Sequence, residues 1–152
     1  MDIDDALVIA LPGVPREMKK MFAASVVPLL QRREPDRAGG VAFRQLHVVG
    51  PSEADLGERI GRWMADDRNP RVGITAHYGE LTVRIAAVGA SDEEARALAD
   101  ATAAELRPAI GADLVYEGER TMPEELFARL DASGQTLAAA ESCTAGLFTA
   151  AL

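Results

Sequence analysis

The chain has 152 residues, of which 48% are hydrophobic, so it is long enough to bury an apolar core. Its 24 acidic side chains outnumber 16 basic ones, and the net charge of −8 disfavours binding to a nucleic-acid backbone. No apolar stretch reaches the roughly 20 residues that span a bilayer, and the first residues do not resemble a secretory signal. A single cysteine, Cys143, cannot form an internal disulfide. We therefore expect a cytoplasmic protein with no membrane segment and no nucleic-acid partner.

The first part of the chain has the pattern of a strand, a turn and a helix. The apolar run from Leu7 to Leu11 stops at a Pro-Gly pair, as a buried strand does on entering a tight turn. Pro15 suits the first turn of a helix, and Pro28 is expected to break or kink that helix. A charged stretch rich in helix breakers follows and ends at Gly40. We interpret it as a linker at a domain boundary.

The middle of the chain predicts the element order β-α-β-β-α-β. Ser52 with Asp55 resembles a helix cap, and Ser91 with Glu94 has the spacing of a capping box at the start of a second helix. Gly79 provides the turn between two runs of alternating apolar residues, which is the clearest hairpin signal in the chain. The expected strands cover residues 41–49, 72–76, 81–87 and 114–116.

This order is that of the ferredoxin-like, or split βαβ, arrangement, an α/β fold of the α+β kind with both helices on one face of an antiparallel sheet. The other face is expected to be open. Alternation places polar side chains there, namely Thr75, His77, Thr82 and Arg84, and His47 can join them. Two histidines on one face can ligate a metal, but no third ligand stands at a fixed spacing. A face that docks on a neighbouring domain or meets solvent is the favoured interpretation.

The last part of the chain begins a new unit. Thr121 and Glu124 form another capping box ahead of a helix that Gly134 ends. The small residues from Thr136 to Ala140 indicate a buried strand, and a further helix should follow it. That helix has neither length nor a cap when it reaches Leu152. We therefore interpret the chain as an internal piece of a longer protein.

Two short segments carry candidate chemistry. In LPGVPREM, residues 11–18, a glycine and the free N–H groups of a helix start are suited to a phosphate, although an ordinary turn is the favoured interpretation. In AAAESCTAGL, residues 138–147, nucleophilic side chains meet at a strand-to-helix turn whose N–H groups can stabilise an oxyanion, which suggests acyl transfer or amide hydrolysis. Alternatively, Ser142 or Thr144 only caps the helix. Cys143 is expected to be a small buried residue.

These two segments resemble the CinA (competence/damage-inducible) family. LPGVPREM is similar to the segment that closes the N-terminal, molybdopterin-binding-like domain of CinA proteins, and AESCTAGL resembles the AESCTGG signature that opens their C-terminal domain. The two occur in the family's order, and the resemblance spans essentially the whole chain. It implies a domain tail at residues 1–40, a small α/β domain at 41–118 and the start of the C-terminal domain at 119–152.

The resemblance also implies activities in pyridine-nucleotide recycling. The family's C-terminal domain is a nicotinamide mononucleotide amidohydrolase that releases ammonia and leaves nicotinic acid mononucleotide, without a cofactor. Ser142 is then the nucleophile, and Glu141, Thr144 and Gly146 shape the substrate pocket. The N-terminal domain is associated with an ADP-ribose pyrophosphatase that needs a divalent metal.

By the same resemblance, Gly13, Pro15 and Glu17 are remnants of the pyrophosphatase site. Ala145 replaces the first glycine of the family's Gly-Gly pair. The lysine and tyrosine that activate the family's serine lie beyond the signature and outside this chain, so we expect these 152 residues to be inactive alone and to serve as a spacer and docking module. We also expect a homo-oligomer. The alternative is a small α/β module that binds RNA or a protein without catalysis.

Overall fold

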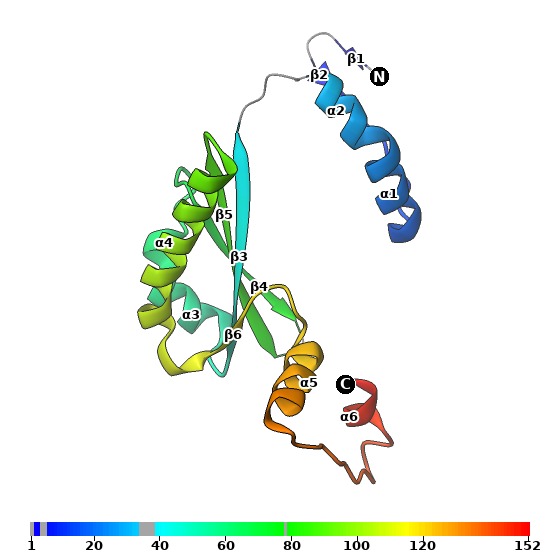
Figure 1. Ribbon diagram of the computed structural model, residues 1–152, viewed down its shortest axis with the longest axis vertical. Coiled ribbons are helices and arrows are strands. Elements are labelled where there is room, and N and C mark those ends of the chain that lie inside the picture. Colours follow the sequence, from blue (N-terminus) through cyan, green and yellow to red (C-terminus); the bar gives the residue numbers. More distant parts are fainter. Residues whose placement is uncertain (1, 4–5, 34–38, 78) are drawn as a thin grey trace. The chain divides into compact units, whose positions relative to one another are not determined.

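The computed structural model describes residues 2–3, 6–33, 39–77 and 79–152 (Figure 1). Most of the expected linker before Gly40, and Tyr78 in the hairpin turn, lie outside the described residues. The chain divides into two compact units, Met1–Ala38 and Gly39–Leu152. Among the helices of the described ranges, none has the length and apolar character that crossing a membrane requires.

The first unit starts with a two-stranded pair, β1 (Asp2–Ile3) and β2 (Ala6–Leu7), which run antiparallel. The prediction of a buried strand from Leu7 to Leu11 is wrong beyond Leu7, because the chain is irregular from there and Val8 and Ile9 are exposed. A strand needs a neighbour for its N–H and C=O groups. Within the described part of this unit, the short β1 is the only strand that pairs with this run.

The helix of the first unit begins at Pro15, as predicted, and continues to Arg33. It consists of α1 (Pro15–Met21), a π-helical stretch (Phe22–Val26) and α2 (Val27–Arg33). Pro28 therefore does not break the helix. Proline lacks an N–H and its ring crowds the carbonyl four residues earlier, which here belongs to the π-helical stretch, where the wider turn relieves that crowding.

The second unit is built on a four-stranded antiparallel sheet with the strand order β4-β5-β3-β6 (Figure 1). Its strands are β3 (Gly40–Val49), β4 (Arg71–His77), β5 (Glu80–Gly89) and β6 (Leu114–Glu117). The helices α3 (Glu53–Ile60) and α4 (Asp92–Ile110) lie on the same face. The predicted order β-α-β-β-α-β is present, and the predicted α/β class of the α+β kind is confirmed.

Two of the three predicted helix caps are complete capping boxes. In α3, the Ser52 hydroxyl accepts from the Asp55 N–H while the Asp55 carboxylate accepts from the Ser52 N–H, and Thr121 and Glu124 do the same at α5 (Met122–Ser133). At α4, Ser91 accepts from the Glu94 N–H, but the Glu94 carboxylate accepts from the Ala90 N–H at 2.6 Å instead. This box is therefore only half formed, because the amide one residue earlier reaches the carboxylate.

The core fills the space between the sheet and its two helices. Leu46, Val83 and Ile85 point inward from the central strands and are fully buried, as are Leu56 and Ile60 of α3. Helix α4 presents alanines to the sheet, and their small side chains allow the helix backbone to approach the strands closely. These buried alanines are Ala95, Ala99 and Ala103.

The start of α4 lies almost directly on two paired glycines, Gly40 of β3 and Gly89 of β5. A methyl group at Gly40 would lie 2.3 Å from backbone atoms of Ser91 and Asp92, and one at Gly89 would lie 2.6 Å from the backbone nitrogen of Ala95. Both distances are far inside van der Waals contact. Glycine at these two positions therefore permits the closest approach between helix and sheet.

We predict that Gly40→Ala lowers the free energy of unfolding by about 1–3 kcal/mol, because the added methyl must displace backbone rather than a flexible side chain. The matched control is Gly57→Ala in α3, where nothing lies within 4 Å of the new methyl group. It should raise stability by about 0.5–1 kcal/mol, since alanine favours a helix interior. Urea unfolding of the 152-residue chain measures both. Equal effects of the two substitutions would contradict the close-approach explanation.

Candidate functional site

The segment that carries the predicted nucleophile follows α5. The prediction of a buried strand from Thr136 to Ala140 is wrong, because these residues are irregular and exposed. In the described part of the chain no strand pairs with them, so the backbone N–H and C=O groups of this run have no partner strand. The expected final helix is short, with α6 covering only Leu147–Ala150 (Figure 1).

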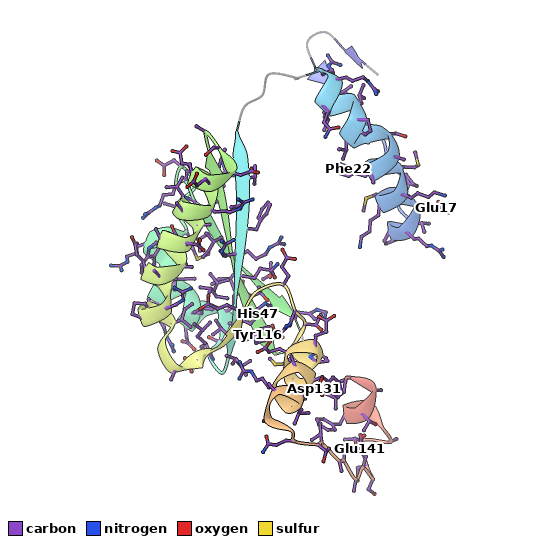
Figure 2. All side chains as sticks on the ribbon, viewed as in Figure 1. Glu17, Phe22, His47, Tyr116, Asp131 and Glu141 are labelled. Atoms are coloured by element: carbon purple, nitrogen blue, oxygen red, sulfur yellow. The ribbon has the colours of Figure 1, made fainter. Side chains whose placement is uncertain are left out.

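Glu141 organises the turn that leads into α6 (Figure 2). One carboxylate oxygen accepts from the Thr144 hydroxyl at 2.8 Å and from the Phe148 N–H at 2.9 Å. The other accepts from the Thr149 hydroxyl at 2.7 Å and from the Thr149 N–H at 3.0 Å. These hydrogen bonds lower the pKa of Glu141 to about 2. The bond from the Thr149 hydroxyl is the largest cause, and the bond from the Thr144 hydroxyl is the next. Glu141 therefore stands as a carboxylate at the amino end of α6.

Ser142 projects from this turn into solvent. Its carbonyl accepts from the Ala145 N–H at 3.2 Å, whereas its hydroxyl makes no hydrogen bond with any described residue. The alternative in which Ser142 or Thr144 caps the helix is wrong, because the residue before α6 is Gly146 and no side chain caps it from that position. The Thr144 hydroxyl donates to Glu141 instead, so the exposed serine has no capping role.

Ala145 and Gly146 both adopt positive φ angles, 49° and 93°. Ala145 is the only residue other than glycine to do so in the ranges that the structure describes. An L side chain in this conformation costs about 1–2 kcal/mol, because its Cβ crowds the following carbonyl. The position at which the resemblance to the CinA family implies a glycine is therefore one where the backbone of this turn is left-handed.

Cys143 was expected to be buried, and this is wrong: its side chain is exposed. The turn lies at the surface with its backbone folded around the Glu141 carboxylate, so the residues between Glu141 and Gly146 face outward. Cys143 thus stands next to Ser142, and both side chains are exposed.

The first predicted segment forms the turn into α1. Gly13, Pro15 and Glu17 are all exposed, and a methyl group at Gly13 would meet nothing within 4 Å. Glu17 is the only carboxylate whose side chain the structure describes in the first unit. Divalent cations take six or more oxygen ligands, several of them carboxylates, so the described residues of this unit do not fit a complete metal site.

A cluster that sequence reasoning largely missed lies on the outer face of the sheet (Figure 2). His47 of β3 is only 5% exposed, and its ring stacks on Tyr116 of β6 with centroids 4.0 Å apart and planes inclined by 5°. Its Nδ1 is hydrogen-bonded to Glu80 of β5, and its Nε2 to the Gly118 carbonyl at 2.9 Å. We call His47, Glu80, Tyr116 and Gly118 the His47 cluster.

Tyr116 completes the His47 cluster, because its hydroxyl donates to Glu80 at 3.0 Å. Burial, and then this hydrogen bond, raise the pKa of Tyr116 above its ordinary value. With both ring nitrogens of His47 engaged, the two-histidine metal site is not formed with His77. No group of three or more potential metal ligands occurs among the described residues.

A cavity of about 780 Å³ opens beside the His47 cluster. Its floor is the outer face of the sheet, including Gln45 and Thr82, and its walls come from the stretch 119–123 and from Phe148 and Leu152. The walls are far apart in sequence, so no local pattern predicts this cavity. The periodicity of β3 and β5 does place His47 and Thr82 on one face, which is the only sequence signal for it.

Comparison with known proteins agrees with this architecture. The family described as "Damage-inducible protein CinA KH domain" matches residues 43–116, and the family "CinA C-terminal domain" matches residues 119–152. Among curated relatives, a "Putative competence-damage inducible protein" of Clostridium kluyveri is 35% identical over 146 residues, which cover 96% of this chain and 35% of the relative.

Two further relatives give the same result. A "CinA-like protein" of Parasynechococcus marenigrum is 37% identical over 99% of this chain and 35% of its own length. A "Putative competence-damage inducible protein" of Shouchella clausii is 37% identical over 99% of this chain and 36% of its own length. The chain belongs to the CinA family and spans about a third of the length of these relatives.

We predict that the α6 turn stays ordered in acid until about pH 2. The folded-state pKa of Glu141 is depressed, so its stabilising bonds are present above the ordinary value of 4.5 and are lost as the pH falls through about 2. Amide exchange at Phe148 and Thr149, followed by NMR, reports the loss. In Glu141→Gln both amides should exchange rapidly at every pH, and retained protection there would contradict this role of the carboxylate.

Proposed function

We propose that this chain is part of a nicotinamide mononucleotide amidohydrolase in which Ser142 attacks the carboxamide carbon. The main support for this proposal comes from the turn within the match to the CinA C-terminal domain. This turn exposes the Ser142 hydroxyl, and Glu141 holds the backbone of the turn by hydrogen bonding. The Ser142 side chain does not cap α6, which was the alternative role for this residue. A free hydroxyl on a rigid turn next to helix N–H groups is the arrangement that nucleophilic catalysis at a carbonyl requires.

The turn also offers donors for the oxyanion. The N–H groups of Phe148 and Thr149 are already bonded to Glu141, so they cannot serve. The N–H groups of Cys143 and Thr144 follow the serine directly and have no acceptor among the described residues. We assign the oxyanion to these two amides, while Glu141 and Gly146 hold the turn.

In this reaction the Ser142 oxygen forms an ester bond to the carboxamide carbon and the C–N bond breaks. The nitrogen takes up a proton and leaves as ammonia, and water then cleaves the ester to give nicotinic acid mononucleotide. The hydroxyl proton needs a base, and no described residue bonds to that hydroxyl. The base therefore has to come from elsewhere in the complete protein, and we expect the 152-residue chain alone to be inactive.

We also propose roles for the first 40 residues and for the middle domain. Gly13, Pro15 and Glu17 belong to an ADP-ribose pyrophosphatase site whose divalent metal would be held by residues outside the described ranges. The middle domain spaces and docks the two catalytic domains, and its outer face exposes Val41 and Phe43 for such contacts. Self-association of the chain stays a prediction.

RNA binding is the second candidate, because the family that matches residues 43–116 is described as a KH domain. KH domains clamp a nucleic-acid backbone with a Gly-x-x-Gly loop. No two glycines of this chain stand three residues apart, and the net charge of −8 opposes a polyanion. We therefore favour the amidohydrolase.

We predict that Ser142→Ala, introduced into a CinA protein that contains this stretch, lowers ammonia release from nicotinamide mononucleotide by about a thousandfold or more, because no ester forms. Ammonia is measured with a coupled assay, and folding is checked by circular dichroism. Undiminished release would remove Ser142 from the reaction.

Two neighbouring substitutions serve as matched controls for Ser142→Ala. Cys143→Ala removes the other exposed nucleophile of the turn and should leave ammonia release within about twofold. Ala145→Gly relieves the positive φ of 49° and should preserve or raise the rate. If Cys143→Ala and not Ser142→Ala abolishes release, the cysteine is the nucleophile.

A further inference from the structure

Two arginines of the second unit have no partner among the described residues. Arg71 of β4 and Arg84 of β5 are exposed and form no ion pair, hydrogen bond or ring contact. All other arginines of this unit make at least one such contact, and the unit contains no lysine. Acidic side chains outnumber basic ones in the chain by 24 to 16, so carboxylates are not scarce. The two unpaired arginines therefore stand out.

The two arginines lie close together on the outer face of the sheet. Arg71 pairs with Ala86, and Arg84 pairs with Gly73, so the arginines occupy diagonal positions on neighbouring strands. The Cα atoms of diagonal residues lie about 7–8 Å apart, and like charges on neighbouring strands repel each other. Carboxylates from a second molecule would relieve this repulsion.

The surface around the arginines is apolar and open. Val41 and Phe43 of β3 and Val88 of β5 are 56%, 54% and 58% exposed. Gly73, opposite Arg84, adds no side chain to this face, although a methyl group there would meet nothing within 4 Å. The packing of the fold does not require this glycine, and glycine in a strand often marks the close approach of another surface. We call this surface the arginine patch, and it consists of Val41, Phe43, Arg71, Gly73, Arg84 and Val88.

The chemistry of the arginine patch selects a protein as its partner. Small ligands need a concave site, whereas the patch lies on the face of a sheet. A nucleic-acid backbone is opposed by the net charge of −8. Arginine and aromatic residues are enriched at protein–protein interfaces. The same patch of a second copy is excluded, because arginines would face arginines. The complementary surface presents two carboxylates beside an apolar side chain.

Helix α5 presents such a surface. Glu124, Phe127 and Asp131 stand at positions i, i+3 and i+7 and share one face of the helix, which we call the α5 face. Phe127 is 46% exposed. Asp131 is exposed, and its carboxylate has no partner among the described residues. Glu124 uses one carboxylate oxygen in its capping box with Thr121 and leaves the other open. The two acidic residues lie about 10 Å apart along the helix, a span that two arginines at diagonal positions can match.

We propose that the arginine patch of one copy of this chain binds the α5 face of a second copy. Glu124 and Asp131 of the second copy accept from the guanidinium groups of Arg71 and Arg84, and Phe127 of the second copy packs on the apolar part of the patch. Arginine suits this contact because its guanidinium binds a carboxylate through two parallel hydrogen bonds.

Both surfaces are present in every chain, so two copies can exchange them. One contact is small, because α5 has 12 residues and is about 18 Å long, whereas stable interfaces bury about 1,200–2,000 Å² in total. Two reciprocal contacts around a two-fold axis double the buried area and close the assembly as a dimer. A chain does not cover its own patch, because Arg129 ties α5 to the Val115 carbonyl at 2.7 Å and the patch stays exposed.

The dimer gives the docking role proposed for the middle domain a specific occupant, the C-terminal segment of a second copy. It rests on that role and not on the amidohydrolase activity, because Ser142 belongs to neither surface. A monomeric chain would therefore contradict the dimer and leave the assignment of Ser142 untouched.

The test is sedimentation velocity of the 152-residue chain over a concentration series. The wild-type chain should form dimers as its concentration rises. Arg84→Glu and Asp131→Arg each bring like charges together and should weaken dimerisation by more than about tenfold. An equimolar mixture of these two variants should dimerise again, because the two reversed charges then attract each other. A wild-type chain that stays monomeric, or a mixture that does not recover, overturns the proposal.

Matched variants separate this contact from changes in net charge or folding. Arg96→Glu on α4 makes the same charge change outside both surfaces and should leave dimerisation unchanged. Gly73→Val adds a side chain where the fold has room, so urea unfolding should show unchanged or higher stability while dimerisation is lost. Dimers that persist in Gly73→Val or Arg84→Glu would use another surface and contradict the proposal. If the wild-type chain is monomeric and binds a single-stranded RNA that Arg84→Glu releases, the patch is a nucleic-acid surface instead.

Discussion

The structure of the middle domain depends on burial of one face of its sheet. Helices α3 and α4 cover that face, and α4 reaches the strands so closely that Gly40 and Gly89 lie under its first turn. This contact excludes side chains at two positions and fixes where α4 starts. Neither α3 nor α4 covers the opposite, outer face of the sheet. The polar and aromatic side chains of that face therefore do not have to form a hydrophobic core.

The outer face is where the middle domain meets the rest of the CinA C-terminal match. The His47 cluster joins β3, β5 and β6 to the residue from which the C-terminal segment departs. Beyond it, the α6 turn is organised by a different anion, Glu141, which occupies the helix N–H groups and leaves Ser142 exposed. Two carboxylates with separate partners thus hold, respectively, the start of the C-terminal segment and the turn that carries Ser142.

The parts of the fold that local chemistry controls were predictable from sequence. Periodicity located β3, β4, β5 and α4, and the Ser52 cap gave the start of α3. Failures occurred where an element depends on distant partners: the runs at Leu7–Leu11 and Thr136–Ala140 look like strands, but no described neighbour pairs with them along their length. The bonds of His47 and Glu141 also escaped prediction, because they join residues across turns and strands that no spacing rule relates.

We propose above all that Ser142 is the nucleophile of an amidohydrolase. It is tested most directly by mixing a CinA protein that contains this stretch with nicotinamide mononucleotide, quenching in acid within one turnover and mapping modified peptides by mass spectrometry. We expect an ester of the nicotinic acid mononucleotide acyl group on Ser142, formed as ammonia appears. Ammonia release with the acyl group on Cys143, or with Ser142 unmodified throughout the turnover, would contradict it.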